Sequence, residues 1–260
     1  NEVVVTGFGM AQKKATLTGA VSSVKSTDIE RSSAVTASGA LVGKIAGLNS
    51  RQQGGAPGAT TALQIRNMGT PLFVIDGVVS DEGQFNNMDF NDIENISILK
   101  DASAALYGVR AANGVIVVTT KKGQRNTRNT VSVDAYYGWQ KNSKFVDPAD
   151  VKEYVHAYTT AETFSGRTDG NRRYSREEYD KWMAGATPAY QGWDWGDYIW
   201  ISAPQYYINT NFSGGTDKAN YYVAVSHINQ DATIRNYGGF RRTNVQMNIE
   251  MNVNERLKVG

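Results

Sequence analysis

The residue types best suited to binding chemistry gather in one short segment. It alternates aromatic and acidic side chains: Trp193, Asp194, Trp195, Asp197, Tyr198 and Trp200. Aromatic rings can stack on sugar rings and carboxylates accept hydrogen bonds from hydroxyl groups, so this segment is a candidate carbohydrate contact. The alternative is that the rings form the core of a long loop or an aromatic girdle at a membrane interface. We prefer this second interpretation.

Catalytic and metal chemistry finds little support in the sequence. The two histidines, His156 and His227, lie on different elements, and the chain has no cysteine. Asp194 and Asp197 lie on a single segment with no partner scaffold, which is a poor arrangement for the acid pair of a glycosidase. No spacing typical of a serine hydrolase, a zinc protease or a phosphate-binding loop occurs. The sequence therefore predicts no enzyme, no metal site and no cofactor.

A β-branched run near the start is a second candidate for binding. It consists of Glu2, Val3, Val4, Val5 and Thr6. An exposed run of this kind can add as a strand to the edge of a partner sheet, with backbone hydrogen bonds supplying the affinity. Nothing nearby in the sequence is expected to pair with it, so it is predicted to be an extended arm. The alternative is that it is only the first strand of the domain that follows.

Composition and charge narrow the class of protein. The net charge of +2 is spread along the chain without a basic block, which argues against a nucleic-acid partner. The longest apolar run, residues 115–118, is far shorter than the roughly 20 residues of a membrane-spanning helix. With 26 glycines, 14 tyrosines and only 5 prolines, the composition favours short strands joined by many turns.

The elements expected up to residue 123 form a small α+β domain. Small and apolar residues at helical spacing predict a helix over 36–46. A helical turn capped by Asn91 or Asp92 and a short helix starting at Asp101 are also expected. The predicted strands are TALQIR, PLFVIDG, ISILK and GVIVVTT, the second ending at a tight turn over Asp76 and Gly77.

Charged residues stand at the ends of these elements: Arg66, Asp76, Lys100, Asp101, Arg110 and Lys121. Some could form ion pairs with a surrounding wall, pairs that must break before the domain can move. For any single residue we prefer the simpler interpretation, which is surface charge or local capping.

Beyond Gly123 the pattern changes to long alternating strands. Val131, Val133 and Trp139 share one face of the first, and polar residues share the other. A hairpin with its turn at 213–217 and a further pair around 253–255 follow. A long insert separates the first strand from the hairpin, with a helix expected to start at Asp147 and Pro148. Period-two alternation fits a soluble β-sandwich as well as an outer-membrane barrel, but one long connection among short turns favours the barrel.

The motifs, taken in order, resemble those of the SusC/RagA family of TonB-dependent outer-membrane transporters. They are EVVVTGFG, GALVGKIAGLNS, ALQIR, PLFVIDGV, DIENISILKDASAALYGVRAANGVIVVTTKKG and FSGGTDKANYYVAVSHINQDA. The longest is the most diagnostic, because so many specific residues occur in register. One departure is the short connection between Arg66 and Pro71, where the family has a longer loop rich in glycine, serine and asparagine.

The resemblance implies an α+β plug domain followed by antiparallel transmembrane β-barrel strands, the start of an incomplete 22-stranded barrel. The Ton box and a connecting arm would occupy residues 1–10 and the plug domain 11–126. The barrel would start over 127–260, with a long extracellular loop at about 141–204. The Ton box would be the run from Glu2 to Thr6. The protein would lie in the outer membrane of a member of the Bacteroidetes, with plug domain and Ton box facing the periplasm.

The resemblance also implies a function, which is active import of a large nutrient driven through TonB. The nutrient expected first is an oligosaccharide, and a peptide comes second. The expected partners are the TonB C-terminal domain, a SusD-like surface lipoprotein that closes over the barrel as a lid, and outer-membrane lipid. Trp193, Asp194, Trp195, Asp197 and Trp200 would contact the substrate or the lid. Two alternatives stay open, a soluble carbohydrate-binding β module and a TonB-linked signalling receptor.

Overall fold

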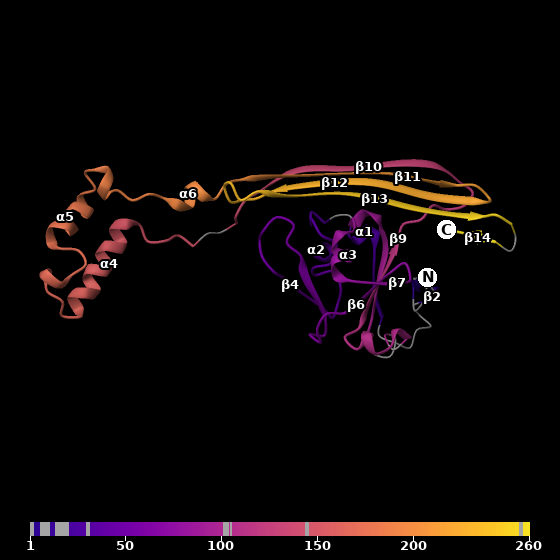
Figure 1. Cartoon of the computed structure of the whole chain (residues 1–260), viewed down its shortest axis with the longest axis horizontal. Coiled ribbons are helices and arrows are strands. Elements are labelled where there is room, and N and C mark those ends of the chain that lie inside the picture. Colours follow the sequence, from indigo (N-terminus) through magenta and orange to yellow (C-terminus); the bar gives the residue numbers. More distant parts are fainter. Residues whose placement is uncertain are drawn as a thin grey trace. The chain divides into compact units, whose positions relative to one another are not determined.

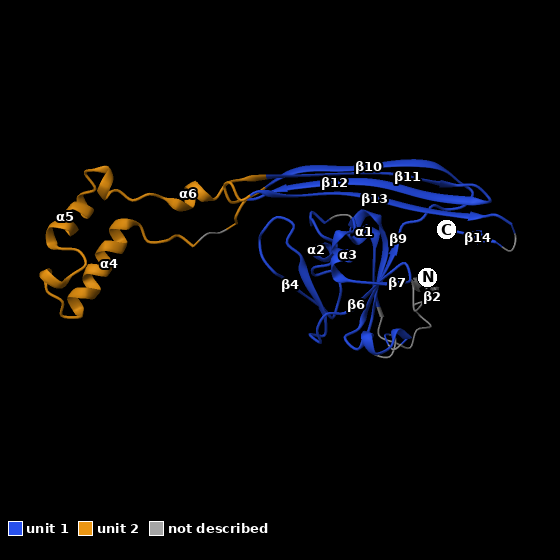
Figure 2. Cartoon of the chain, in the orientation of Figure 1, with its two compact units in different colours: residues 1–139, 204–232, 238–260 blue, residues 140–203, 233–237 orange. Residues whose placement is uncertain are grey.

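The computed structural model of the chain describes residues 3–5, 11–13, 21–29, 32–100, 104, 106–143, 146–254 and 257–260. The chain divides into two compact units, coloured separately in Figure 2. Unit 1 comprises residues 1–139, 204–232 and 238–260, and unit 2 comprises residues 140–203 and 233–237. Unit 1 holds the plug domain together with a sheet of long strands.

A five-stranded sheet forms the centre of the plug domain. Its strands in spatial order are β3 (Val21–Lys25), β8 (Ile93–Leu99), β9 (Val115–Thr120), β6 (Leu72–Ile75) and β7 (Val78–Ser80). Strands β6 and β9 are parallel, and the other neighbours are antiparallel. Two small sheets pair β1 (Val3–Val5) with β2 (Ala11–Lys13) and β4 (Leu48–Gln52) with β5 (Thr61–Ile65). The helical elements are α1 (Ser26–Ile29), α2 (Ala37–Ala40), α3 (Glu82–Asn87), η3 (Phe90–Asp92) and η5 (Val109–Ala111).

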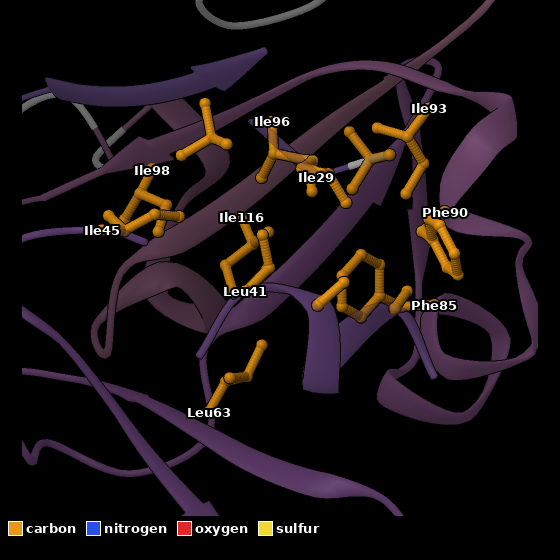
Figure 3. Close-up of a cluster of buried hydrophobic side chains, with 14 of the residues drawn as sticks. Ile29, Leu41, Ile45, Leu63, Phe85, Phe90, Ile93, Ile96, Ile98 and Ile116 are labelled. Atoms are coloured by element: carbon orange, nitrogen blue, oxygen red, sulfur yellow. The ribbon is translucent and has the colours of Figure 1, made fainter. Parts of the chain in front are cut away.

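The plug domain has its own hydrophobic core on both faces of the central sheet. Ile96, Ile98 and Ile116 point to one face, where they meet Phe85 in the cluster of Figure 3. A second cluster, which includes Leu72, Val74, Leu99, Val115 and Val117, covers the other face. Burial on both faces explains why strand β9 reads as a continuous apolar run instead of alternating.

The turn after β6 is as the sequence predicted. Asp76 and Gly77 both adopt positive φ, at 49° and 88°, and join β6 to the antiparallel strand β7. The Asp76 carboxylate then accepts hydrogen bonds from the backbone N–H of Thr120 at 2.9 Å and from its hydroxyl at 2.6 Å. Asp76 therefore ties the turn to the end of β9.

Two helical predictions in the plug domain are wrong, one in its length and one in its capping residue. The helix expected over 36–46 is α-helical only over α2, because Gly43 turns the chain at a φ of 70° and irregular turns follow. The turn at η3 is capped by Asp89, whose carboxylate accepts from the N–H of Asn91 at 2.8 Å, and not by Asn91 or Asp92. The predicted start at Asp101 lies outside the described residues.

A second sheet contains the long strands, and we call it the long sheet. In spatial order its strands are β10 (Thr127–Gln140), β11 (Ala203–Gly215), β12 (Ala219–Asp231), β13 (Gly239–Asn252) and β14 (Lys258–Val259). They run side by side in Figure 1, with the plug domain against one face. Strands β11 to β14 pair antiparallel in turn.

The long sheet is apolar on the face turned away from the plug domain. Val131 and Trp139 on β10 are 63% and 71% exposed, and Val245 on β13 is 71% exposed. The opposite face carries polar residues such as Asn209 and Ser226, which are buried against the plug domain. This is the arrangement of a sheet between lipid and a polar lumen, so the predicted alternation along β10 is confirmed.

One of the two predicted turns between the long strands needs a correction. The β11–β12 turn lies at residues 216–218 and not at 213–217, because Gly214 and Gly215 still belong to β11. A Cβ on Gly215 would lie 2.5 Å from the carbonyl oxygen of Gln124, so Gly215 admits a close backbone approach instead of forming the turn. Strand β13 ends and β14 begins on either side of the turn expected at 253–255, of which residue 255 lies outside the described range.

Unit 2 is largely helical. Its elements are α4 (Val151–Phe164), η6 (Asp169–Asn171), α5 (Arg176–Ala184), η7 (Pro188–Tyr190) and α6 (Trp195–Ile199). Helix α4 starts after Asp150 and not at Pro148, because Asp150 and Glu153 form a capping box in which each side chain accepts from the other's backbone N–H. Within the described ranges, no helix is long and apolar enough to cross a membrane.

Gly123 offers a test of how the plug domain is joined to the long sheet. A Cβ there would overlap the carbonyl oxygen of Tyr221 and lie 2.6 Å from that of Gly214. We expect Gly123→Ala to lower the free energy of unfolding of the full-length protein by about 1–3 kcal/mol, because rigid backbone would have to shift. Thermal unfolding in detergent measures this. Gly138→Ala on β10 meets no atom within 4 Å and is the control, and equal melting temperatures for the two variants would refute the expectation.

Candidate functional site

The plug domain meets the long sheet through buried polar side chains. Both carboxylate oxygens of Asp89 accept from the hydroxyl of Tyr207 on β11, at 2.8 and 2.9 Å. The Asp92 carboxylate accepts from the hydroxyl of Tyr222 on β12 at 2.9 Å. All four residues are at most 3% exposed. We call these four residues the carboxylate–tyrosine contact.

The short helix η3 positions both carboxylates. Asp89 caps its start, and Asp92 is its last residue, so one helical turn presents both side chains to the sheet. The amide of Asn91 donates to the Tyr207 hydroxyl at 2.8 Å, and the Phe90 ring stacks on the Tyr207 ring with centroids 5.7 Å apart. Burial, and then the charge of Asp89, raise the pKa of Asp92 to about 6.

Side chains of strand β13, in the long sheet, make further hydrogen bonds to the plug domain. Arg242 donates to the carbonyl oxygen of Asn86 at 2.9 Å, and Asn244 donates to that of Asn87. The Asn248 amide donates to the Thr120 hydroxyl at 2.9 Å and to the backbone carbonyl of Lys121 at 2.7 Å. A cavity of about 240 Å³ remains beside these contacts, lined by Gln84, Asn87, Met88, Asp89, Asp92, Asn244, Val245 and Gln246.

The charged residues singled out from the sequence serve mainly inside the plug domain. Asp76 binds Thr120, and the Lys100 ammonium donates to the carbonyl oxygen of Ala46 at 2.6 Å and to the Ser22 hydroxyl at 3.0 Å. Arg66 and Arg110 are exposed, and Lys121 is partly exposed. Asp101 lies outside the described residues.

Lys122, the residue after the predicted Lys121, forms an ion pair with the long sheet. Its ammonium lies 2.8 Å from a carboxylate oxygen of Glu250 on β13, and the hydrogen bond between them raises the pKa of Lys122. Lys258 approaches the other oxygen of Glu250 at 3.0 Å. The sequence does not single out Lys122, because two adjacent lysines after a strand do not reveal which one faces the long sheet.

The predicted Ton box lies partly within the described residues. Val3, Val4 and Val5 form strand β1 and pair antiparallel with residues 11–13 in strand β2. The expectation that nothing nearby pairs with this run is therefore wrong, because β2, a few residues further along the sequence, pairs with it. Glu2 and Thr6 lie outside the described residues.

The aromatic and acidic segment folds around the short helix α6. The rings of Trp193, Trp195 and Tyr198 meet edge to face, with centroids 6.2 to 6.5 Å apart. Trp193 and Trp195 are nevertheless 66% and 64% exposed. The Asp194 carboxylate caps α6 by accepting from the N–H of Asp197 at 3.1 Å. The guanidinium of Arg235 lies 4.9 Å from the centroid of the Tyr198 ring.

A groove of about 790 Å³ runs beside these rings within unit 2, and we call it the aromatic groove. The segment predicted from the sequence lines it with Trp193, Asp194, Trp195 and Trp200, whereas Asp197 lines an adjacent cavity of about 400 Å³. The other side of the groove comes from residues that sequence analysis did not select: Asp147, Asp150, Val151, Lys152, Tyr154 and Trp182. Its volume is within the range of small-molecule sites.

Comparison with known proteins gives consistent similarities. Residues 13–115 match the family model of the TonB-dependent receptor plug domain. TonB-dependent receptor P26 of Formosa agariphila is 32% identical over 100% of this chain and 26% of its own length. TonB-dependent receptor SusC of Bacteroides thetaiotaomicron is 31% identical over 96% of this chain and 24% of its own length.

Solved structures agree with these relatives. The RagAB peptide importer in its open-open state superposes with a TM-score of 0.82 and 26% identity, over 98% of this chain and 31% of the importer chain. The chain thus spans about a quarter of the length of the curated relatives that it matches. With a plug domain bound to the polar face of an apolar-faced sheet, the chain belongs to the SusC/RagA family of TonB-dependent outer-membrane receptors, of which it holds the plug domain and first barrel strands.

Proposed function

We propose that the full-length protein imports a large nutrient across the outer membrane, driven through TonB. The observation that carries this proposal is a self-contained plug domain held to barrel strands by polar contacts. Such a domain can leave the wall without exposing its own core, as an import path requires. A soluble carbohydrate-binding module would not leave apolar side chains such as Val131 and Trp139 bare along one face of its sheet.

Strand β1 is the proposed point of attachment for TonB. Val3, Val4 and Val5 pair with only three residues of β2, and a two-stranded sheet of that size is weak on its own. Among the described residues, β1 pairs with β2 on one edge, and we propose that its other edge accepts a further strand. The TonB C-terminal domain would pair with that backbone or displace β2, and pulling would then act along the chain toward the plug domain.

Val4 provides a test of TonB coupling. Val4→Pro removes a backbone N–H from β1, so we expect uptake to fall at least about tenfold while the protein still reaches the outer membrane. Val4→Thr keeps the β-branched shape and the backbone donor, and should retain most of the uptake. Growth on the transported nutrient, measured with surface expression, tests both. Normal growth of the proline variant would remove β1 as the coupling strand.

The aromatic groove is the proposed contact for the substrate or the lid, and an oligosaccharide is the first candidate. Exposed rings of Trp193 and Trp195 can stack on sugar rings, and the Asp147 carboxylate beside them can accept hydroxyl hydrogen bonds. A peptide is the second candidate, because the RagAB structure that covers 98% of the chain is described as a peptide importer.

The groove proposal is tested by removing its two most exposed rings. Trp193→Ala with Trp195→Ala should raise the concentration of oligosaccharide that half-saturates uptake by about tenfold, since each ring contact contributes on the order of 1 kcal/mol. Phe164→Ala is the control, because this ring is 88% exposed in the same unit but does not line the groove. Equal affinities in both variants would leave the rings with a structural role only.

The lid is tested by copurification. We expect a stoichiometric surface lipoprotein to remain with the tagged full-length protein after extraction of the outer membrane in mild detergent. The trapped substrate, identified by mass spectrometry of sugars and peptides, would decide between the two nutrient classes. Recovery of the protein alone, in the soluble fraction, would contradict import and favour a soluble binding module.

A further inference from the structure

We propose that the ionised Asp92 carboxylate destabilises the docking of the plug domain on the long sheet. Its buried negative charge lowers the free energy needed to release the plug domain, and a proton bound to Asp92 strengthens the carboxylate–tyrosine contact. This inference concerns the docking of the plug domain and does not depend on the nutrient.

The two carboxylates of the contact are unequally satisfied. Asp89 accepts from the Tyr207 hydroxyl through both oxygens and from the backbone N–H of Asn91. Asp92 accepts from the Tyr222 hydroxyl at 2.9 Å, and the side chain of Asn209 also favours its ionised form. Asp92 is 3% exposed, so little of its carboxylate reaches bulk water. A buried carboxylate with few donors is costly to ionise, and a second carboxylate nearby adds to that cost.

Charged and titratable groups face Asp92 from every element packed around it. They are Asp89 at the start of η3, Tyr207 on β11, Tyr222 on β12 and Lys121 after β9, while Arg242 on β13 interacts with Asp89 and Tyr207. Arg242 directs one guanidinium N–H to the carbonyl oxygen of Asn86. The charge of Lys121 favours the ionised form of Asp92 but is outweighed by burial and by Asp89. No histidine takes part, since His156 and His227 bond to Tyr179 and Thr243.

The direction of the pH effect follows from the balance of these groups. The pKa of Asp92 rises from 3.8 to about 6 in the docked state. The docked state therefore binds a proton more tightly than the released state, in which water solvates the carboxylate. Docking is strongest below pH 3.8, the ordinary pKa of the carboxyl. It weakens as the pH rises through about 6 and is weakest near neutral pH. At neutral pH the ionised Asp92 thus lowers the cost of releasing the plug domain.

Hydrogen exchange of the full-length protein tests the proposal without TonB or substrate. Protection factors of the η3 amides, corrected for intrinsic rates, should be about tenfold higher at about pH 5 than at about pH 7.5. This arm uses the wild-type protein and so does not depend on how a variant folds. Equal protection at both pH values would overturn the proposal.

Matched variants distinguish a carboxylate whose charge weakens docking from one that only anchors the contact. Asp92→Asn should raise protection at about pH 7.5 by about tenfold and abolish its pH dependence, because the neutral amide has no charge to bury. Asp89→Asn should lower protection at both pH values, because Asp89 is the well-satisfied partner. Tyr206→Phe, on the opposite face of β11, is the control and should change nothing. A loss of protection in Asp92→Asn, or a retained pH dependence, would show that Asp92 is only a structural anchor.

The same experiment is independent of the import function. If Val4→Pro abolished uptake while the exchange pattern of Asp92→Asn was as expected, both proposals would stand. If the exchange results failed and uptake still required Val4, only the role of Asp92 would be lost.

Discussion

The long sheet has its apolar side chains on the face away from the plug domain, and the rest of the structure depends on that constraint. A sheet that gives lipid its apolar face has only a polar face left for the plug domain. The contacts between the plug domain and the long sheet are therefore mainly polar, with one small apolar cluster in which Val35 of the plug domain packs near Tyr207 and Ile228. The plug domain is held chiefly by side-chain hydrogen bonds, such as those from Tyr207 and Tyr222, whose net contribution is modest because water can replace either partner.

The plug domain answers this constraint by being complete in itself. Its sheet is covered on both faces by its own residues, so most of its hydrophobic core does not involve the long sheet. Contacts to the wall come from the edges of elements, chiefly η3 and the segment after β9. A domain whose core is formed by its own residues and whose outer contacts are mainly polar can move as a body or in part. A domain that shared its main hydrophobic core with the barrel would have to unfold before it could move.

Several features of the fold could be predicted from the sequence because they depend on neighbouring residues. The turn at Asp76 and Gly77 follows from their tolerance of positive φ, and the lipid-facing side of β10 follows from alternation. Predictions failed where a distant partner decided the local structure. Gly214 and Gly215 look like turn residues, yet they extend β11 by pairing with β12, and the backbone of Gln124 passes close to Gly215. The pairing of Val3 to Val5 with β2 was missed for another reason, since Ala11–Lys13 lacks the β-branched residues that mark a strand.

The sequence by itself determined the elements, the apolar face of each strand and, through its motifs, the family. Only the tertiary structure decided which residues meet. Asp89 and Tyr207 are 118 residues apart in the chain, and Asp92 and Tyr222 are 130 apart. The aromatic groove likewise joins Trp193 to Tyr154 and Trp182 from two other helices. Periodicity and propensity report interactions over a few residues, whereas these contacts depend on strand register and on the docking of one domain against a sheet.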